Sequence, residues 1–318
     1  MSNLRYLTNR LQYVGRFKLI KLLNLLPDFD GLTLIDIGAA GGIEPRWNQI
    51  AKKINLIGFE PDVGAHEKLI AEGNNCKDYI VHPFAIWSHS EGIPIIFSKK
   101  PEVSSHFAAN MDFLVNFPQS NRFERVKVET VMSKTLDSLK VKNPDFMKID
   151  IQGAELNALL GSKETLKNCI GVELEVEFTE MYLGQPLFGE IAKHLVESGF
   201  EFYDFLNLCR WERDSHSGLG QLVFGDALFL RSPENFLANK KSNQQISTYL
   251  GILALYNRFD LILHVQKRLA VAQNLEYQVF FKAAAKLRSQ QNKLNFIVRV
   301  LNGLLKSIRA NFKLHLIN

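Results

Sequence analysis

The chain has 318 residues, of which 46% are hydrophobic and 22% are charged. This composition is ordinary for a globular protein, and the length allows one large domain plus an accessory one. The three cysteines, Cys76, Cys169 and Cys209, show no C-x-x-C spacing. Without that spacing, the sequence predicts neither a disulfide framework nor a cysteine zinc site. It favours a reducing, cytoplasmic location.

The net charge of +5 conceals a step along the chain. From Leu237 to Asn318 there are 13 Lys and Arg against 2 Asp and Glu, whereas residues 1–236 carry 25 against 31. The step predicts a second module with an anionic partner, either an anionic membrane surface or, less favoured, nucleic acid. The alternative is that the basic segment docks on the acidic body. Oligomeric state is not predicted.

The N-terminal segment is basic throughout and lacks the continuous apolar run of a signal peptide. Its leucines recur at helical spacing up to Pro27, which predicts a helix over residues 1–27. No apolar stretch of the chain reaches the roughly 20 residues of a membrane span. We therefore expect a cytoplasmic protein, with peripheral membrane contact left open by the basic C-terminal segment.

Between residues 31 and 232, Val- and Ile-rich runs alternate with helical periods. This order predicts an α/β fold with a mostly parallel sheet, and a polar link before the last run predicts an antiparallel last strand. Two runs, 93–98 and 125–131, look like an inserted hairpin near a ligand mouth. The runs are LTLIDI, INLIGFE, DYIVHPFAI, IPIIFS, RVKVETV, DFMKIDI, CIGVELEVE, FEFYDFL and GQLVFGDALFLR.

Beyond Pro233 the pattern is helical, over 243–273, 275–290 and 293–312, with polar joints at Asn274 and at 291–292. The predicted organisation is therefore an N-terminal helical segment (1–30), an α/β domain (31–235) and a basic helical extension (236–318).

The stretch IDIGAAGG places Asp36 at the end of the first strand and glycines directly after it. Glycines allow a ligand to approach the backbone, and Glu60, at the end of the second strand, can bind ribose hydroxyls. The pattern is not the G-x-G-x-x-G of dinucleotide sites. A carboxylate before the turn suits the ammonium group of S-adenosylmethionine better than a pyrophosphate. The alternative is a purely structural strand-to-helix turn.

Several segments together resemble the FkbM family of S-adenosylmethionine-dependent methyltransferases, over about residues 31–231. The most specific is K-I-D-x-x-G-x-E, formed by Lys148, Ile149, Asp150, Gly153 and Glu155. The others are LIDIGAAGG, IGFEPD, VHPFAIWSHSEG, TLDSL and VELEVEF.

The resemblance implies a class I methyltransferase fold, which is Rossmann-like, and O-methylation of a sugar, glycan or secondary-metabolite hydroxyl. It implies no metal ligands, because Gln152 stands where the family usually has an acid. The residues predicted to bind the cofactor are Asp36, Gly38, Ala39, Ala40, Gly41, Gly42, Glu60, Pro61, Ala85, Ile86 and Trp87.

The predicted catalytic residues are Asp150, Lys148 and Glu175. A hydroxyl acceptor needs a base, and Asp150 ends a strand at the expected mouth. Lys148 pairs with it or steadies an oxyanion, and Glu175 points into the substrate cleft. His82 and His106 are alternative bases. A nucleic-acid methyltransferase using the basic tail and a cofactor-binding module without turnover are the alternative functions.

Overall fold

The computed structural model describes residues 16–213, 220–290 and 292–293. The chain divides into two compact units: residues 31–238 form one, and residues 1–30 together with 239–318 form the other. The sequence predicts the two terminal segments as separate parts, whereas the described portions of both belong to the same unit. No described helix is long and apolar enough to cross a membrane.

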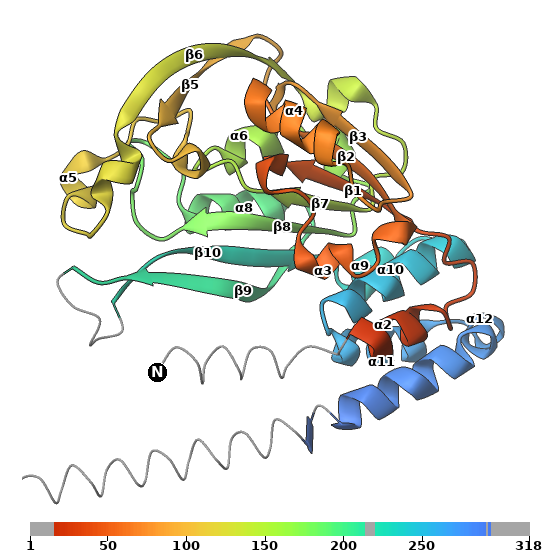
Figure 1. Cartoon of the computed structure of the whole chain (residues 1–318). Helices are drawn as coiled ribbons and strands as arrows, with labels where there is room; N and C mark the ends of the chain where they lie inside the picture. The colour runs from red at the N-terminus through yellow and green to blue at the C-terminus, as the bar shows by residue number, and fades with distance from the viewer. Residues whose placement is uncertain (1–15, 214–219, 291, 294–318) are drawn as a thin grey trace, which may run out of the picture. The chain divides into compact units, whose positions relative to one another are not determined.

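The larger unit contains a seven-stranded sheet of order β3-β2-β1-β7-β8-β10-β9 (Figure 1). All neighbours pair in parallel except β10, which is antiparallel to both β8 and β9. This order and the single reversed strand are those of the predicted class I methyltransferase fold. The strands are β1 (Leu32–Ile37), β2 (Ile54–Phe59), β3 (Asp78–His82), β7 (Phe146–Ile149), β8 (Gly171–Glu177), β9 (Glu201–Trp211) and β10 (Gln221–Leu230).

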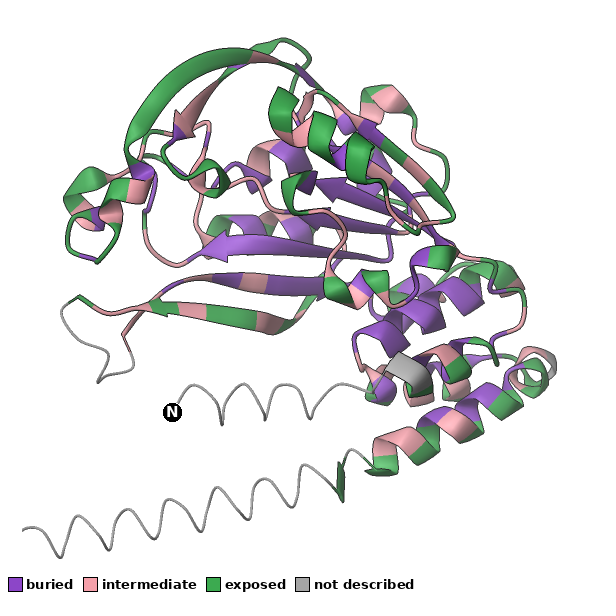
Figure 2. Ribbon diagram, viewed as in Figure 1, coloured by how far each residue is buried: buried purple, intermediate pink, exposed green. Residues whose placement is uncertain are grey.

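The inner strands are buried along their whole length (Figure 2), as expected for a parallel sheet that is covered on both faces. In β8, Val172, Leu174 and Val176 face an apolar core with α6 (Glu155–Leu160) and α8 (Phe188–Glu197). The intervening glutamates lie on the opposite face. The remaining helices of this unit are α3 (Pro45–Asn48), α4 (Val63–Glu72), α5 (Met111–Leu114), α7 (Lys163–Leu166) and α9 (Pro233–Phe236).

The predicted insertion forms a separate three-stranded sheet of order β4-β6-β5. Its strands are β4 (Ala85–Ile86), β5 (Gly92–Ser98) and β6 (Arg125–Lys134). β5 and β6 are antiparallel, which confirms the predicted pairing, although α5 and two short 3-10 turns separate them in sequence. The predicted eighth run, FEFYDFL, is also confirmed as β9, but β9 extends to Trp211, through residues predicted as a loop.

The smaller unit contains α2 (Arg16–Leu23), α10 (Asn243–Leu255), α11 (Phe259–Arg268) and α12 (Val271–Glu276), followed by helical residues 278–290. Residues 1–15 of the predicted N-terminal helix and most of the predicted 293–312 helix lie outside the described residues. The single helix predicted over 243–273 is wrong. Asn257 adopts φ 58°, a left-handed conformation that asparagine tolerates, and it ends α10.

The predicted joint at Asn274 is also wrong, because that residue lies inside α12 and the turn is at Tyr277. Ser242 and Gln245 form a reciprocal capping box that begins α10. The Ser247 hydroxyl donates to the Pro27 carbonyl, which ties the residues after α2 to the middle of α10.

Two segments of backbone cross closely at the edge of the sheet where the parallel strands end. Gly38 follows β1 with φ 88°, and its amide donates to the Phe59 carbonyl at 3.1 Å. A Cβ atom on Gly38 would lie 2.0 Å from the carbonyl oxygen of Asp150. Only glycine fits where the turn after β1 passes over the end of β7.

We predict that Gly38→Ala lowers the free energy of unfolding by about 2–4 kcal/mol, because it adds both a clash and a strained φ. Gly41→Ala is the matched control: no atom lies within 4 Å of its added Cβ. We expect that change to stay within about 1 kcal/mol. Denaturant unfolding measures both, and equal stabilities of the two variants would contradict the crossing.

Candidate functional site

The carboxyl ends of β1, β2 and β7 open into a cavity of about 450 Å³, a volume typical of small-ligand sites. The sheet order reverses between β1 and β7, which is where open α/β sheets bind ligands. The cavity lining comes from five segments: residues 37–45, 59–65, 85–106, 148 and 150–154.

The glycine turn forms one wall. Gly38 and Gly42 have φ values of 88° and 69°, and Gly41 has no neighbour that a Cβ would touch. The turn therefore presents bare backbone to the cavity, with room for a ligand to approach closely.

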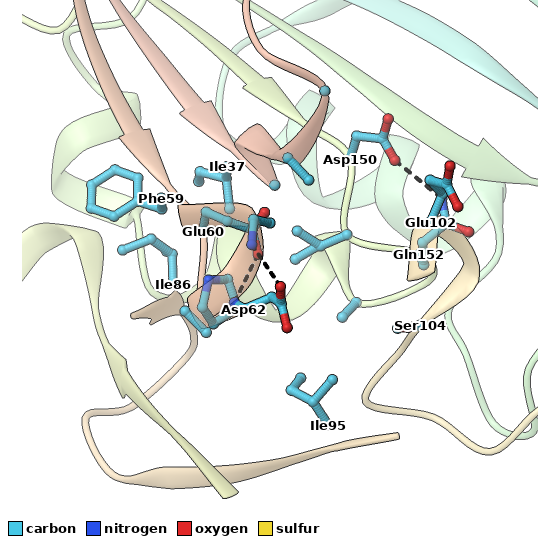
Figure 3. Close-up of a pocket in the computed structure, with 18 of the residues that line it drawn as sticks. Ile37, Phe59, Glu60, Asp62, Ile86, Ile95, Glu102, Ser104, Asp150 and Gln152 are labelled. Carbon is cyan, nitrogen blue, oxygen red and sulfur yellow. Dashed lines mark hydrogen bonds between the residues drawn. The ribbon is translucent and has the colours of Figure 1, made fainter. Parts of the chain in front are cut away.

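Glu60 directly follows β2 and is only 5% exposed. Its backbone amide donates to the His82 carbonyl at 3.0 Å, and its Oε1 accepts the Asp62 amide at 2.8 Å. Burial raises the pKa of Glu60, and the amides of Asp62 and Ala40 oppose the rise. Asp62 itself caps α4 by accepting the Ala65 amide at 2.8 Å (Figure 3). Two fixed carboxylates thus stand together at this end of the cavity.

An apolar wall faces these carboxylates. Phe59 and Ile86 lie close to Glu60 in Figure 3, and Ile95 reaches the cavity from β5. Ile93, Ile95 and Phe97 alternate along β5 and all line the cavity, so the insertion contributes one whole strand face. The sequence predicts this hairpin near the mouth, and the spacing of two between these residues is the signal that could have identified them as lining residues.

Lys148 is the cationic centre of the site. Its Nζ lies 3.6 Å from Asp36 Oδ1, 3.7 Å from Glu44 Oε1 and 3.7 Å from Asp150 Oδ2. Burial alone lowers the pKa of Lys148, but the carboxylates of Asp36, Asp150 and Glu44 outweigh burial and raise it. The ammonium group is therefore retained and compensates the surrounding negative charge.

Asp36 lies beneath the turn, 2% exposed, rather than on the cavity surface. Burial raises its pKa to about 6, and the charge of Lys148 opposes the rise. The cation beside Asp36 is therefore Lys148 of this chain. The sequence predicts the ammonium group of a ligand in that position.

A hydrogen-bonded chain runs from the cavity into the protein. Gln152 Nε2 donates to Asp150 Oδ1 at 3.1 Å and to Glu175 Oε1 at 2.8 Å. Gln152 Oε1 lies 3.0 Å from the Tyr182 hydroxyl, and the Gln152 carbonyl accepts the Ser105 hydroxyl at 2.6 Å. Gln152 is therefore held by four hydrogen bonds, and in turn it orients Asp150.

Glu175 is 8% exposed and contacts the cavity only through Gln152. Burial raises the pKa of Glu175 well above its ordinary value, and the charges of Asp150 and Glu177 add to the effect. The sequence predicts that Glu175 points into the cleft, whereas in the structure Glu175 does not line the cavity. The amide of Gln152, not the carboxylate, forms the surface there.

The local backbone explains the G-x-E spacing of Gly153 and Glu155. Gln152 and Gly153 turn the chain with φ values of 58° and 92° after β7. Glu155, the first residue of α6, folds back so that its Oε1 accepts the Ile151 amide at 2.9 Å and the Gly153 amide at 3.3 Å. The carboxyl closes the loop that carries Asp150 and Gln152, and it is fully buried.

The structure brings most of the predicted residues together. Asp36, Ala39 and Glu175 lie outside the cavity wall. Ala39 packs instead against Leu69 and Val81. The predicted residues that line the cavity are Gly38, Ala40, Gly41, Gly42, Glu60, Pro61, Ala85, Ile86, Trp87, Lys148 and Asp150.

The two histidines differ in position. His106 lines the cavity, with its ring 4.6 Å from that of Trp87 and its Nδ1 2.9 Å from the Pro94 carbonyl oxygen. His82 stacks on Phe59 outside the lining, and burial lowers its pKa. Among the described residues, no group of three or more His, Cys, Asp or Glu is arranged to hold a metal ion.

The sequence profile of the methyltransferase FkbM domain matches residues 36–202, which is more than half of the chain. The chain belongs to the FkbM methyltransferase family. The matched region contains the glycine turn, Glu60 and the Lys148–Glu155 loop. The family is S-adenosylmethionine-dependent, so the cofactor of this chain is S-adenosyl-L-methionine.

Solved structures are similar at low identity. Methyltransferase FkbM from Methylobacillus flagellatus KT is 14% identical with a TM-score of 0.38, and the match covers 65% of this chain and 45% of that one. TrmK from M. capricolum, solved with S-adenosyl-homocysteine, is 11% identical with a TM-score of 0.34, covering 85% and 96%. This chain thus spans less than half of the Methylobacillus protein. Curated proteins yield no match.

We predict that Glu155→Gln flattens the pH dependence of stability. Burial raises the pKa of Glu155 from 4.5 to about 8, so the folded state holds this proton more tightly than the unfolded chain does. Its contribution to stability is therefore present below about pH 4.5 and is lost as pH rises towards 8. Glutamine mimics the protonated form and keeps an acceptor for both amides.

Thermal unfolding of both proteins between pH 5 and 8 measures the effect. Glu164→Gln, at an exposed carboxylate paired with Lys167, is the control and should keep the wild-type slope. A slope for Glu155→Gln equal to that of the wild type would show that the buried carboxyl is not protonated in the folded state.

Proposed function

We propose that the chain transfers a methyl group from S-adenosylmethionine to a hydroxyl oxygen of a sugar, a glycan or a secondary metabolite, with Asp150 as general base. The observation that carries the proposal is that Asp150 lines the same cavity as Glu60 and the glycine turn. Its side chain is 38% exposed and stands at the carboxyl end of β7, so a hydroxyl in the cavity can reach it.

The cavity fits the cofactor in its chemistry. Glu60 offers a carboxylate for ribose hydroxyls, and Phe59, Ala85 and Ile86 offer an apolar wall for an adenine ring. The glycine turn leaves backbone accessible for the methionine portion. When bound, the cofactor supplies the electrophilic methyl group, and the protein supplies position and electrostatics.

The residues around Asp150 fix the orientation of its carboxylate. Gln152 donates to one carboxylate oxygen, and Lys148 lies 3.7 Å from the other. A proton that leaves an acceptor hydroxyl passes to this carboxylate as the oxygen attacks. Lys148 and Glu175 are positioning residues in this scheme, since Lys148 balances the charge of Asp150 and Glu175 holds Gln152.

The charge of the cavity favours an uncharged acceptor. Carboxylates of Glu44, Glu60, Asp62, Glu102 and Asp150 line it, and the lining lysine is already surrounded by acids. A nucleic-acid phosphate close to the methyl group would meet this negative field, whereas sugar hydroxyls can donate to carboxylates. The acidic lining of the cavity therefore favours a hydroxyl acceptor over a nucleic acid.

We predict that Glu60→Ala weakens S-adenosylmethionine binding by about 10–100-fold, because hydrogen bonds to a charged group are lost. Isothermal calorimetry measures the affinity, and Glu60→Gln tests the charge with the shape retained. Glu72→Ala removes an exposed glutamate of α4 that pairs with Lys68, and it should leave binding unchanged. Full affinity in Glu60→Ala would remove the ribose assignment.

We predict that Asp150→Asn keeps cofactor affinity but lowers turnover by about 10²–10⁴-fold, the usual contribution of a general base. Asparagine retains an oxygen for the Gln152 amide, so the loop should keep its shape. The assay follows radioactive methyl transfer from S-adenosylmethionine into glycan and metabolite extracts. Unchanged incorporation would eliminate Asp150 as base, and no incorporation by the wild type would favour a cofactor-binding module.

A further inference from the structure

An exposed apolar line runs along α12 and the helical residues after it. Val271, Leu275 and Val279 are 80%, 65% and 62% exposed. They are four residues apart, so they lie on one side of the helix. Aliphatic side chains exposed to this extent gain nothing from the protein's own core, and their alignment distinguishes them from scattered surface residues.

The helix continues past Tyr277, so the line can be followed further. The Tyr277 amide donates to the Gln273 carbonyl at 3.4 Å, and the Phe281 amide donates to the Tyr277 carbonyl at 3.0 Å. Lys282 and Lys286 are exposed. At 3.6 residues per turn, both lie with the three aliphatic residues in an arc of about 80°.

The opposite side of the same helix is buried. Tyr277, Phe280, Phe281 and Ala284 are at most 1% exposed, so the orientation of the helix within its unit is fixed. The helix therefore presents one defined face to the outside, made of three aliphatic side chains followed by two lysines. We call this set, Val271, Leu275, Val279, Lys282 and Lys286, the outer face.

The charged residues of the outer face itself, Lys282 and Lys286, are both basic. Glu276 is the acid of this helical segment, and its Oε2 accepts the Asn243 Nδ2 at 2.6 Å. Lys267, one turn before Val271, is exposed. A partner of the outer face must therefore be anionic.

We propose that the outer face binds the surface of an anionic lipid bilayer. The aliphatic side chains enter the boundary between headgroups and acyl chains, and the lysines meet the headgroup phosphates. Nucleic acid would account for the lysines but not for the aliphatic side chains. Proteins that bind single strands stack the bases on aromatic side chains, whereas Val271, Leu275 and Val279 are aliphatic. A second copy of the chain would add lysines to the contact and no acid of the outer face to pair with them.

Flotation of the full chain with lipid vesicles tests the proposal without cofactor or acceptor. We expect binding to vesicles that contain phosphatidylglycerol and little binding to pure phosphatidylcholine. Lys282→Glu with Lys286→Glu should weaken binding about tenfold or more, since each charge near the surface contributes to attraction. Lys52→Glu with Lys163→Glu is the control: both lysines are exposed in the other unit, and the change in net charge is the same.

A second variant tests the apolar part at constant charge. Leu275→Ser with Val279→Ser should weaken vesicle binding while leaving the melting temperature near that of the wild type, because both side chains are already exposed. Wild-type binding by both double variants, or no preference of the wild type for anionic vesicles, overturns the proposal. Tighter binding of a single-stranded oligonucleotide than of vesicles at equal salt, lost in the lysine variant, overturns it in favour of nucleic acid.

Discussion

The site depends on one close backbone crossing, at which the turn after β1 passes over the end of β7. Gly38 and Asp150 come within a distance that leaves no space for a side chain. The crossing places the glycine turn and the Asp150 carboxylate on one cavity, although 112 residues separate them in sequence. The proposed cofactor-binding turn and the proposed general base are therefore parts of the same structural feature. A change that relaxes the crossing should disturb both.

Burial of charge beneath the cavity is the second constraint. Lys148 lies among Asp36, Glu44 and Asp150, so the central strands can carry carboxylates on a covered face. Without the lysine, the buried carboxyl group of Asp36 would have to bind a proton or leave the interior. Gln152 extends the same principle with a neutral amide, which joins Asp150 to Glu175 without adding charge. The position of Asp150, the proposed base, is thus set by its hydrogen bond with Gln152 and its ion pair with Lys148.

The two units of the chain differ in the charge and chemistry of their surfaces. The larger unit supplies an acidic cavity with an apolar wall, suited to a nucleoside and to an uncharged acceptor. The smaller unit contains the basic helices, and its outer face is a separate surface with its own chemistry. A methyltransferase held at an anionic bilayer would meet acceptors that are attached to lipids more often than acceptors free in solution. This combination links the charge step in the sequence to a choice of substrate.

The sequence by itself determined the succession of strands and helices along the chain and the family motifs around Gly38, Glu60 and Asp150, because these follow from local alternation of residues and from contiguous motifs. Only the tertiary structure decided that Asp36 faces Lys148, that Glu175 reaches the cavity through Gln152, and that β5 forms a wall. Each of these depends on which strands become neighbours. The break of the predicted tail helix at Asn257 is of the same kind, because a periodic apolar pattern does not reveal where packing requires the chain to turn. Local patterns predict elements, whereas side-chain partners arise from contacts between distant segments.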